Sequence, residues 1–133
     1  MNLHHIGIVV EDLAAYGELC GVCLGLTADS AVYQDPIQQV RIQFWKDARG
    51  NMLELIEPDG PDSPVLGTLT KGGGLNHLCY EVEDIDEQVR ISIEQGAIAT
   101  SGIVPAVALS GRRVAFLFFP KLNLVDFVEA PGK

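Results

Sequence analysis

The sequence predicts an α+β fold made of two tandem βαβββ modules, and three observations support this prediction. The chain is similar to itself at a constant offset. Each half begins with an apolar strand pattern that ends at an acidic pair, where a helix can start. Each half then ends with two further strand patterns. The predicted organisation is a first module at residues 1–58, a linker at 59–74 and a second module at 75–133.

The repeat is visible at both ends of each half. His5 in LHHIGIVVEDL corresponds to His77 in LNHLCYEVEDI, an offset of 77 − 5 = 72 residues. Glu54 in MLELIEP corresponds to Asp126 in LVDFVEA at the same offset, since 126 − 54 = 72. A register kept over about fifty positions indicates an internal duplication.

One helix is predicted after the first strand of each half. Asp12 can N-cap a helix that runs to about Cys23, and Gly25 can end it. Asp84 is expected to play the same part in the second half, where Gly96 stops the helix. The expected helices therefore cover residues 13–23 and 85–95.

The remaining elements are strands, apart from one loop. Ile- and Val-rich or alternating patterns predict strands near residues 3–10, 37–45, 52–57, 112–119 and 124–129, with shorter ones near 30–34 and 98–101. The linker DGPDSPVLGTLTKGGG is rich in proline and glycine, which predicts turns and loop.

Composition excludes several classes of function. The formal net charge of −9 argues against nucleic-acid binding, because few cations are present to replace the counterions of phosphates. No apolar run reaches the ~20 residues of a membrane helix, and no signal peptide is recognisable, so a cytoplasmic protein is expected. Three cysteines agree with a reducing compartment. Cys20 and Cys23 have CxxC spacing but fall near a helix C-terminus, and are expected to be buried structural thiols.

The repeated histidine and acid of each half form a candidate metal site. Alternation along a strand places Glu54 on one face with Met52 and Ile56, and a carboxylate among apolar neighbours needs a partner. If the halves pack with pseudo-two-fold symmetry, two imidazoles and two carboxylates meet. The expected ligands of one divalent ion (Co, Mn, Ni, Fe or Zn) are His5, Glu54, His77 and Asp126.

The alternative is that these side chains are structural. A single histidine on a strand is more often hydrogen-bonded structure than a ligand, and a carboxylate near a strand end is usually solvated. That both pairs follow the same repeat favours the metal site. Of the adjacent Phe44 and Trp45, at most one can line it, because neighbouring strand residues face opposite ways.

The sequence resembles the vicinal oxygen chelate (glyoxalase/bleomycin resistance/dioxygenase) superfamily over essentially its whole length. Within it, the chain is most similar to the methylmalonyl-CoA epimerase branch. The resemblance implies paired βαβββ modules in a U-shaped mixed sheet around a metal held by the four residues above. The segments that carry it are HHIGIVV (4–10), ELIEPDGPDSPVL (54–66), GLNHLCYEVEDI (74–85) and GRRVAFLFFPK (111–121).

The resemblance implies a metal-dependent isomerase or epimerase that stabilises an enolate during proton transfer next to a carbonyl, with Asp126 or Glu54 as the base. The substrate would be a small molecule such as an acyl-CoA thioester, and its anionic groups could be held by Arg112, Arg113 or Lys121. A homodimer is also implied. A glyoxalase of the lactoylglutathione lyase type and a non-catalytic binding (resistance) protein are the alternatives.

Two departures from the family pattern affect the expected chemistry. The last ligand is usually Glu, whereas this chain has Asp126. Some epimerases use a second carboxylate on the strand that corresponds to 37–46, which contains no acid in this chain. Gln43 or a water on the metal would have to take its place, or a two-base mechanism is absent.

Overall fold

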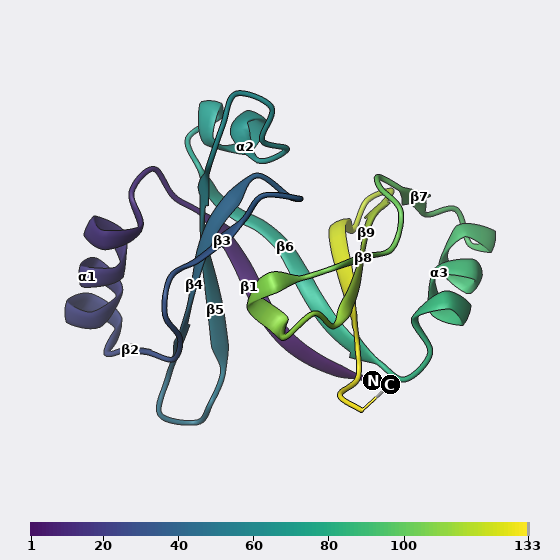
Figure 1. The fold of residues 1–133 in the computed structure, drawn as a ribbon, viewed down its shortest axis with the longest axis horizontal. Coiled ribbons are helices and arrows are strands. Elements are labelled where there is room, and N and C mark those ends of the chain that lie inside the picture. Colours follow the sequence, from purple (N-terminus) through teal and green to yellow (C-terminus); the bar gives the residue numbers. More distant parts are fainter. Residues whose placement is uncertain (133) are drawn as a thin grey trace. The chain divides into compact units, whose positions relative to one another are not determined.

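The computed structural model describes residues 1–132, which form ten strands and three α-helices (Figure 1). The α+β class is therefore confirmed. The chain divides into two units: an N-terminal unit, residues 5–76, and a C-terminal unit, residues 1–4 and 77–132. The helices formed by these residues lack the length and apolar character to cross a membrane.

The N-terminal unit is a mixed sheet with the strand order β2-β4-β5-β1, in which β3 also pairs with β4. Strands β1 and β5 are parallel, whereas β4 is antiparallel to its neighbours. The elements are β1 (Asn2–Val9), α1 (Leu13–Leu24), β2 (Thr27–Ala28), β3 (Tyr33–Asp35), β4 (Val40–Lys46), β5 (Met52–Pro58) and α2 (Leu66–Thr70).

The C-terminal unit repeats this arrangement: its order is β7-β9-β10-β6, which corresponds strand by strand to β2-β4-β5-β1, and β8 also pairs with β9. Strands β6 and β10 are parallel, and β9 is antiparallel to its neighbours. The elements are β6 (Gly74–Val82), α3 (Ile85–Glu94), β7 (Ile98–Ala99), β8 (Val104–Pro105), a 3₁₀ turn η1 (Val107–Leu109), β9 (Arg113–Phe119) and β10 (Asn123–Glu129).

Strand registers repeat between the units. Gly7 pairs with Glu54 in one unit, and Cys79 pairs with Asp126 in the other, so both partners are displaced by 72 residues. The antiparallel pairs behave in the same way: Phe44 lies opposite Glu54, and its repeat Phe116 lies opposite Asp126. The long strands therefore bear out the duplication at the level of individual hydrogen-bonded pairs.

The short strands depart from this offset. Tyr33 pairs with Ile42, whereas Val104 pairs with Val114, so the short strands are displaced by 104 − 33 = 71 residues and their partners by 72. The C-terminal unit is one residue shorter across its helix: the N-caps Asp12 and Asp84 differ by 84 − 12 = 72 residues, whereas Gly25 and Gly96, which follow the helices, differ by 96 − 25 = 71.

The single short strand predicted in each half is two short strands. In the N-terminal unit the chain leaves the edge of β4 between β2 and β3, and Ser30 Oγ accepts a hydrogen bond from the Phe44 amide at 3.0 Å. In the C-terminal unit Thr100 Oγ1 donates to the Phe116 carbonyl at 3.1 Å. A side chain thus takes part in the ladder at this point, and regular pairing is interrupted.

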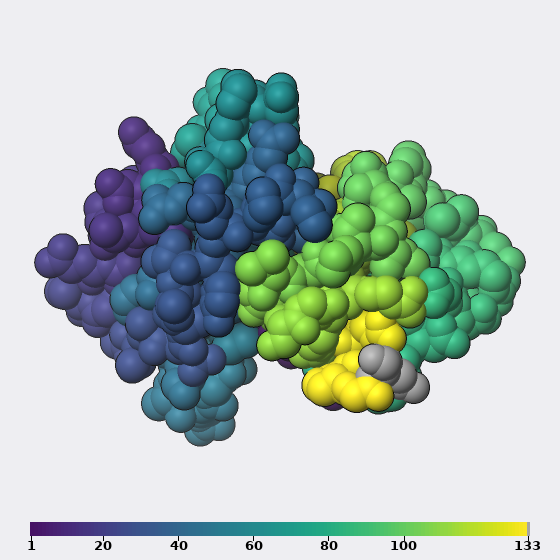
Figure 2. Space-filling view, viewed as in Figure 1, coloured from purple at the N-terminus to yellow at the C-terminus, as the bar shows by residue number. Residues whose placement is uncertain are grey.

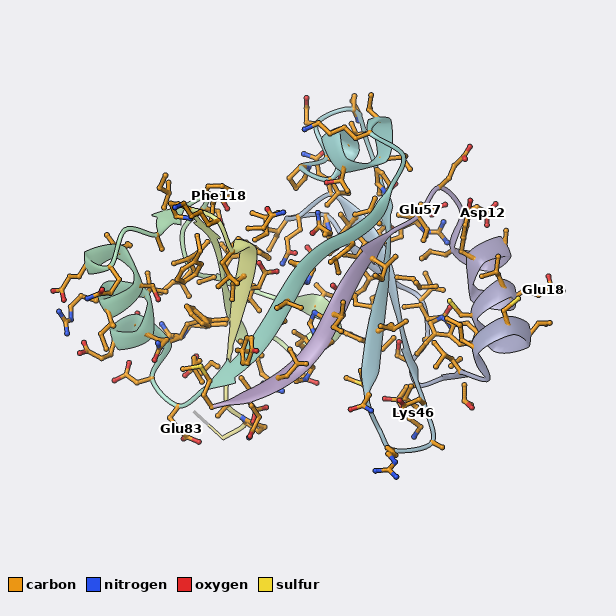
Figure 3. The ribbon with its side chains drawn as sticks, turned by 180° about the vertical axis from the view of Figure 1, so that it is seen from behind. Asp12, Glu18, Lys46, Glu57, Glu83 and Phe118 are labelled. Atoms are coloured by element: carbon orange, nitrogen blue, oxygen red, sulfur yellow. The ribbon has the colours of Figure 1, made fainter. Side chains whose placement is uncertain are left out.

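Both predicted helices are present with the predicted N-caps. The Asp12 carboxylate accepts from the Ala15 amide and the Asp84 carboxylate from the Glu87 amide, both at 3.0 Å. Figure 3 shows Asp12 at the first turn of α1 and Glu18 on its outer side. Gly25 ends α1 with φ +66°, a left-handed conformation that glycine adopts readily. The prediction of loop for 59–74 omitted the short helix α2.

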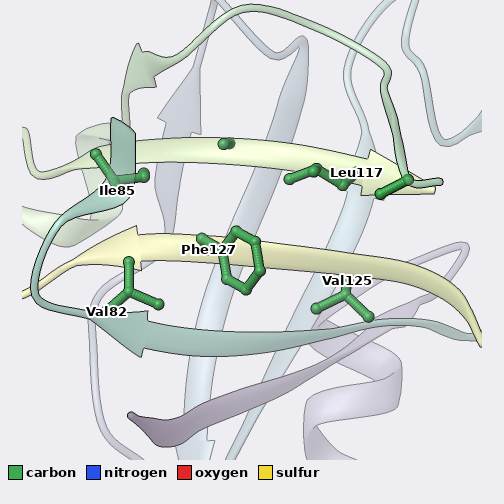
Figure 4. Close-up of a cluster of buried hydrophobic side chains, with 7 residues drawn as sticks. Val82, Ile85, Leu117, Val125 and Phe127 are labelled. Atoms are coloured by element: carbon green, nitrogen blue, oxygen red, sulfur yellow. The ribbon is translucent and has the colours of Figure 1, made fainter. Parts of the chain in front are cut away.

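Each helix covers one face of its own sheet. Leu13 and Cys20 of α1 pack with Leu55 of β5, with Trp45 at the edge of the cluster. The corresponding cluster under α3 consists of Val82, Ile85, Ala97, Ala115, Leu117, Val125 and Phe127 (Figure 4). The opposite face of each sheet is therefore the one available for a site.

We expect Gly17→Ala to destabilise the protein, because Trp45 packs directly on this glycine. A Cβ at position 17 would lie 2.6 Å from Trp45 Cζ2. We expect the free energy of unfolding, measured with urea, to fall by about 1–3 kcal/mol, as in other overpacked cores.

Gly21→Ala in the same helix is the matched control. Its Cβ would meet nothing nearer than the Leu26 carbonyl oxygen at 3.7 Å, so helix propensity should raise stability by up to about 1 kcal/mol. Equal effects of the two substitutions would contradict the packing argument.

Candidate functional site

The N-terminal unit holds a buried imidazole–carboxylate pair. His5 Nε2 and Glu54 Oε1 lie 3.3 Å apart, and the two residues are 3% and 8% exposed. The pair arises because β1 and β5 are parallel with Gly7 opposite Glu54, so His5 is one step along the same face. Phe44 packs edge-on against the His5 ring, with centroids 5.2 Å apart. Of the two adjacent aromatic residues, Phe44 is therefore the one beside the pair.

The C-terminal unit holds the equivalent pair. His77 Nε2 and Asp126 Oδ2 also lie 3.3 Å apart, and the residues are 7% and 6% exposed. Cys79 is directly opposite Asp126, at the position that Gly7 occupies in the first repeat, and is 1% exposed. Each unit thus presents one buried nitrogen–oxygen pair on the sheet face away from its helix.

The donor geometry within each pair fits a divalent metal. Two ligand atoms, each about 2.1 Å from one ion, are separated by roughly 3.0 Å at an octahedral edge and roughly 3.4 Å at a tetrahedral one. The separation of 3.3 Å in both pairs falls in this range. His5 and Glu54 are thus a possible His/Glu metal-binding group.

Gln43 is not brought to the pair. It lies opposite Leu55, whose side chain packs under α1, so Gln43 is on the helix side of the sheet. Its amide donates to the Ser30 carbonyl at 3.0 Å. On the face that carries Glu54, β4 instead presents Ile42 and Phe44.

Arg113 has structural partners. Its guanidinium donates to Glu129 at 2.6 Å and to Asp86 of α3 at 3.0 Å. Hydrogen bonds to these carboxylates raise the pKa of Arg113. The first repeat contains the same pair, because Arg41 donates to Glu57 at 2.7 Å. A pair present in both repeats, and partly exposed, is accounted for by the fold.

Arg112 is also engaged. It donates to the Glu81 carboxylate at 2.6 Å and to the Glu129 carbonyl at 2.7 Å, which ties β6 and β10 together. A hollow of about 330 Å³ lies beside it. Lys121, in the turn between β9 and β10, forms no ion pair within the described residues. Of the three cationic side chains expected to bind an anion, Arg112 and Arg113 are paired with carboxylates, whereas Lys121 has no ion-pair partner in the described residues.

The CxxC motif does not form a buried pair. Cys20 of α1 is buried, as expected, whereas Cys23 of the same helix is exposed, which contradicts the expectation of burial for this residue. Burial, and then the nearby Cys23, raises the pKa of the Cys20 thiol. A raised thiol pKa opposes redox or metal chemistry at this position.

A duplicated unit, in which one helix covers a sheet of five strands and a buried imidazole–carboxylate pair lies on the other face, defines the class to which this protein belongs. Residues 4–116 match the Glyoxalase/Bleomycin resistance protein/Dioxygenase superfamily. The chain belongs to this superfamily.

Its relatives include epimerases of acyl-CoA thioesters. An ethylmalonyl-CoA/methylmalonyl-CoA epimerase of Cereibacter sphaeroides is 34% identical over 122 residues, which is 87% of each chain. The crystal structure of methylmalonyl-CoA epimerase from Mycobacterium tuberculosis superposes with a TM-score of 0.84 at 26% identity, covering 98% of this chain and 89% of that one. A Streptomyces coelicolor methylmalonyl-CoA epimerase in complex with 2-nitronate-propionyl-CoA gives 0.82 at 26% identity, over 99% of both chains.

We expect Arg112→Met to lower the free energy of unfolding by about 1–2 kcal/mol, because Glu81 and the Glu129 carbonyl would both lose their donor. Lys121→Met should change it by less than about 0.5 kcal/mol. Urea denaturation of the two variants beside the parent protein is the measurement. A loss at Lys121 as large as that at Arg112 would contradict this division between structural and free cations.

Proposed function

We propose that the protein is an epimerase of the vicinal oxygen chelate type that acts on a 2-alkylmalonyl-CoA thioester, as its relatives are named for doing. The observation that carries the proposal is the pair of buried imidazole–carboxylate groups, repeated at the same strand positions in both units. The similarity to named epimerases over 87% of the chain supports the substrate class.

We propose that His5, Glu54, His77 and Asp126 hold one divalent metal ion. The nitrogen and oxygen donors suit a borderline or hard cation and do not distinguish Co, Mn, Ni, Fe and Zn. When bound, such an ion acts as a Lewis acid that stabilises negative charge on the substrate's carbonyl oxygens. The burial of each pair among apolar residues would strengthen this electrostatic effect.

The side chains of the protein would then move the proton. Glu54 or Asp126 would take the proton from the carbon between the thioester and the carboxylate of the substrate. Lys121 would hold an anionic group of the substrate, because its ammonium group has no partner in the described chain. Association into a homodimer, expected from the resemblance, stays a prediction that sedimentation can test.

We expect the purified protein to contain about one equivalent of divalent metal per chain, and His5→Ala/His77→Ala to lose it. Removal of two of four ligands should weaken binding by well over tenfold. Elemental analysis is one measurement. The second is the rise in melting temperature when metal is added to chelator-treated protein, which needs no substrate.

The control for this experiment is His4→Asn, which copies the residue that the second repeat has at this position, Asn76. It should keep its metal. Unchanged metal content in the His5/His77 double variant would contradict the proposed centre.

We expect the protein to exchange the α-proton of methylmalonyl-CoA with deuterium from heavy water and to interconvert the two epimers, both in a metal-dependent way. Proton NMR follows the exchange, and chromatography follows the epimer ratio. Turnover of a hemithioacetal of glutathione without this exchange would indicate a glyoxalase. Tight ligand binding with neither activity would indicate a binding protein.

A further inference from the structure

The face of β4 beside the His5–Glu54 pair is hydrocarbon. Ile42 and Phe44 lie on this face, opposite Ile56 and Glu54 of β5, and both are buried. The third residue of this row, Val40, is also apolar. No carboxylate therefore rises from β4 to act as a second proton-transfer group.

The next strand supplies a phenol on the same face. Tyr33 of β3 pairs directly with Ile42, and directly opposed residues of an antiparallel pair point to the same side. The side of Tyr33 is thus the side of Ile42, Phe44 and Glu54. Tyr33 is half-buried, and its hydroxyl forms no hydrogen bond within residues 1–132.

Other polar side chains on this face are engaged. Asp35 pairs across Val40 and is 4% exposed, but its carboxylate accepts from the Ile37 and Gln38 amides. Lys46 forms an ion pair with Asp29 at 3.0 Å. Apart from the His5–Glu54 pair itself, Tyr33 is the uncommitted titratable group of this face in the part of the chain described.

The repeat shows that the fold does not require a tyrosine here. The position equivalent to Tyr33 in the C-terminal unit is Val104, which pairs with Val114 and packs against the buried cluster around Val128. A valine fills the same structural position there. The phenol is therefore present in one repeat only, as expected for a catalytic group that the fold itself does not require.

We propose that the Tyr33 hydroxyl is the second proton-transfer group of the site, opposite Glu54 across the apolar surface of Ile42 and Phe44. From strand spacing and rise, the Cα atoms of Tyr33 and Glu54 lie roughly 12 Å apart with β4 between them. A small group that lies on β4 between them can therefore be reached by the Tyr33 side chain from one side and by the Glu54 side chain from the other. The blue segment that includes β3 lies at the surface in Figure 2, so solvent can reach it.

The proton transfer balances without a further reactant. The carbon–hydrogen bond of the substrate breaks as an O–H bond forms on Glu54, and the electron pair moves into the thioester carbonyl. The Tyr33 O–H bond then breaks as a carbon–hydrogen bond forms on the opposite side of the carbon, which leaves a phenolate. Water returns both side chains to their starting protonation, and the phenolate is the base in the reverse direction.

This inference rests on the proposed epimerase function, and Tyr33→Phe separates the two. With one methylmalonyl-CoA epimer in heavy water, the parent protein should introduce deuterium with inversion. In Tyr33→Phe, Glu54 can still remove and return a proton from its own side. We therefore expect deuterium to enter with retention, at a rate within about threefold of the parent exchange rate, while inversion falls by about 100-fold or more.

Two variants are matched controls. Tyr16→Phe removes a phenol from the exposed side of α1, and Gln43→Leu removes the amide on the helix side of β4. Both should keep exchange and inversion unchanged.

The remaining outcomes overturn the proposal in distinguishable ways. If Tyr33→Phe inverts the substrate like the parent, or loses exchange and inversion equally, Tyr33 is not the second group, and the epimerase function stands. If the metal-loaded parent protein neither exchanges nor inverts, the proposed function fails and this inference fails with it.

Discussion

The parallel pairing of the first and last strands of each repeat is the constraint on which the rest of this structure depends. It sets Gly7 opposite Glu54 and Cys79 opposite Asp126, and so places a histidine two residues earlier beside each acid. The same register directs Leu55 and Phe127 to the helix side, where they join the cores. A slip of one residue would send the carboxylates under the helices and the core residues to the other face. Core and candidate site are therefore specified together.

Much of this arrangement was predictable from the sequence because it is local or repeated. Asp12 and Asp84 mark the helix starts by their chemistry, and the 72-residue offset pairs the four candidate ligands without knowledge of the fold. Alternation within β4 also showed that Phe44 and its neighbours divide between two faces. Which face belongs to Glu54 depends on the partner strand, however, and is known only from the pairing of Phe44 with Glu54. The expectation for Gln43 rested on its place in the strand, and this pairing puts it on the helix side.

The features that were not predictable depend on tertiary context. The helix α2 is only five residues long and lies in a segment rich in proline and glycine, so it is too short to show a helical repeat of apolar residues in the sequence. The split of each short strand depends on Ser30 and Thr100, whose hydroxyls bond to the neighbouring strand. Tyr33 had no motif to single it out. The face on which Tyr33 lies is defined by its pairing with Ile42, which is a tertiary contact.

Comparison of the repeats separates what the fold needs from what it merely permits. The ion pair of Arg41 with Glu57 recurs as Arg113 with Glu129, at matching strand positions, and each clamps two strands at a partly exposed edge. The imidazole–carboxylate pairs also recur, but they lie on buried faces, where apolar residues of similar size usually give equal or greater stability. Stability alone therefore accounts for the first kind of repeat and not for the second. A ligand that needs nitrogen and oxygen donors gives a reason for the second. A reaction that needs different groups on the two sides of one carbon gives a reason for the phenol of Tyr33 in one repeat, where the other repeat has Val104.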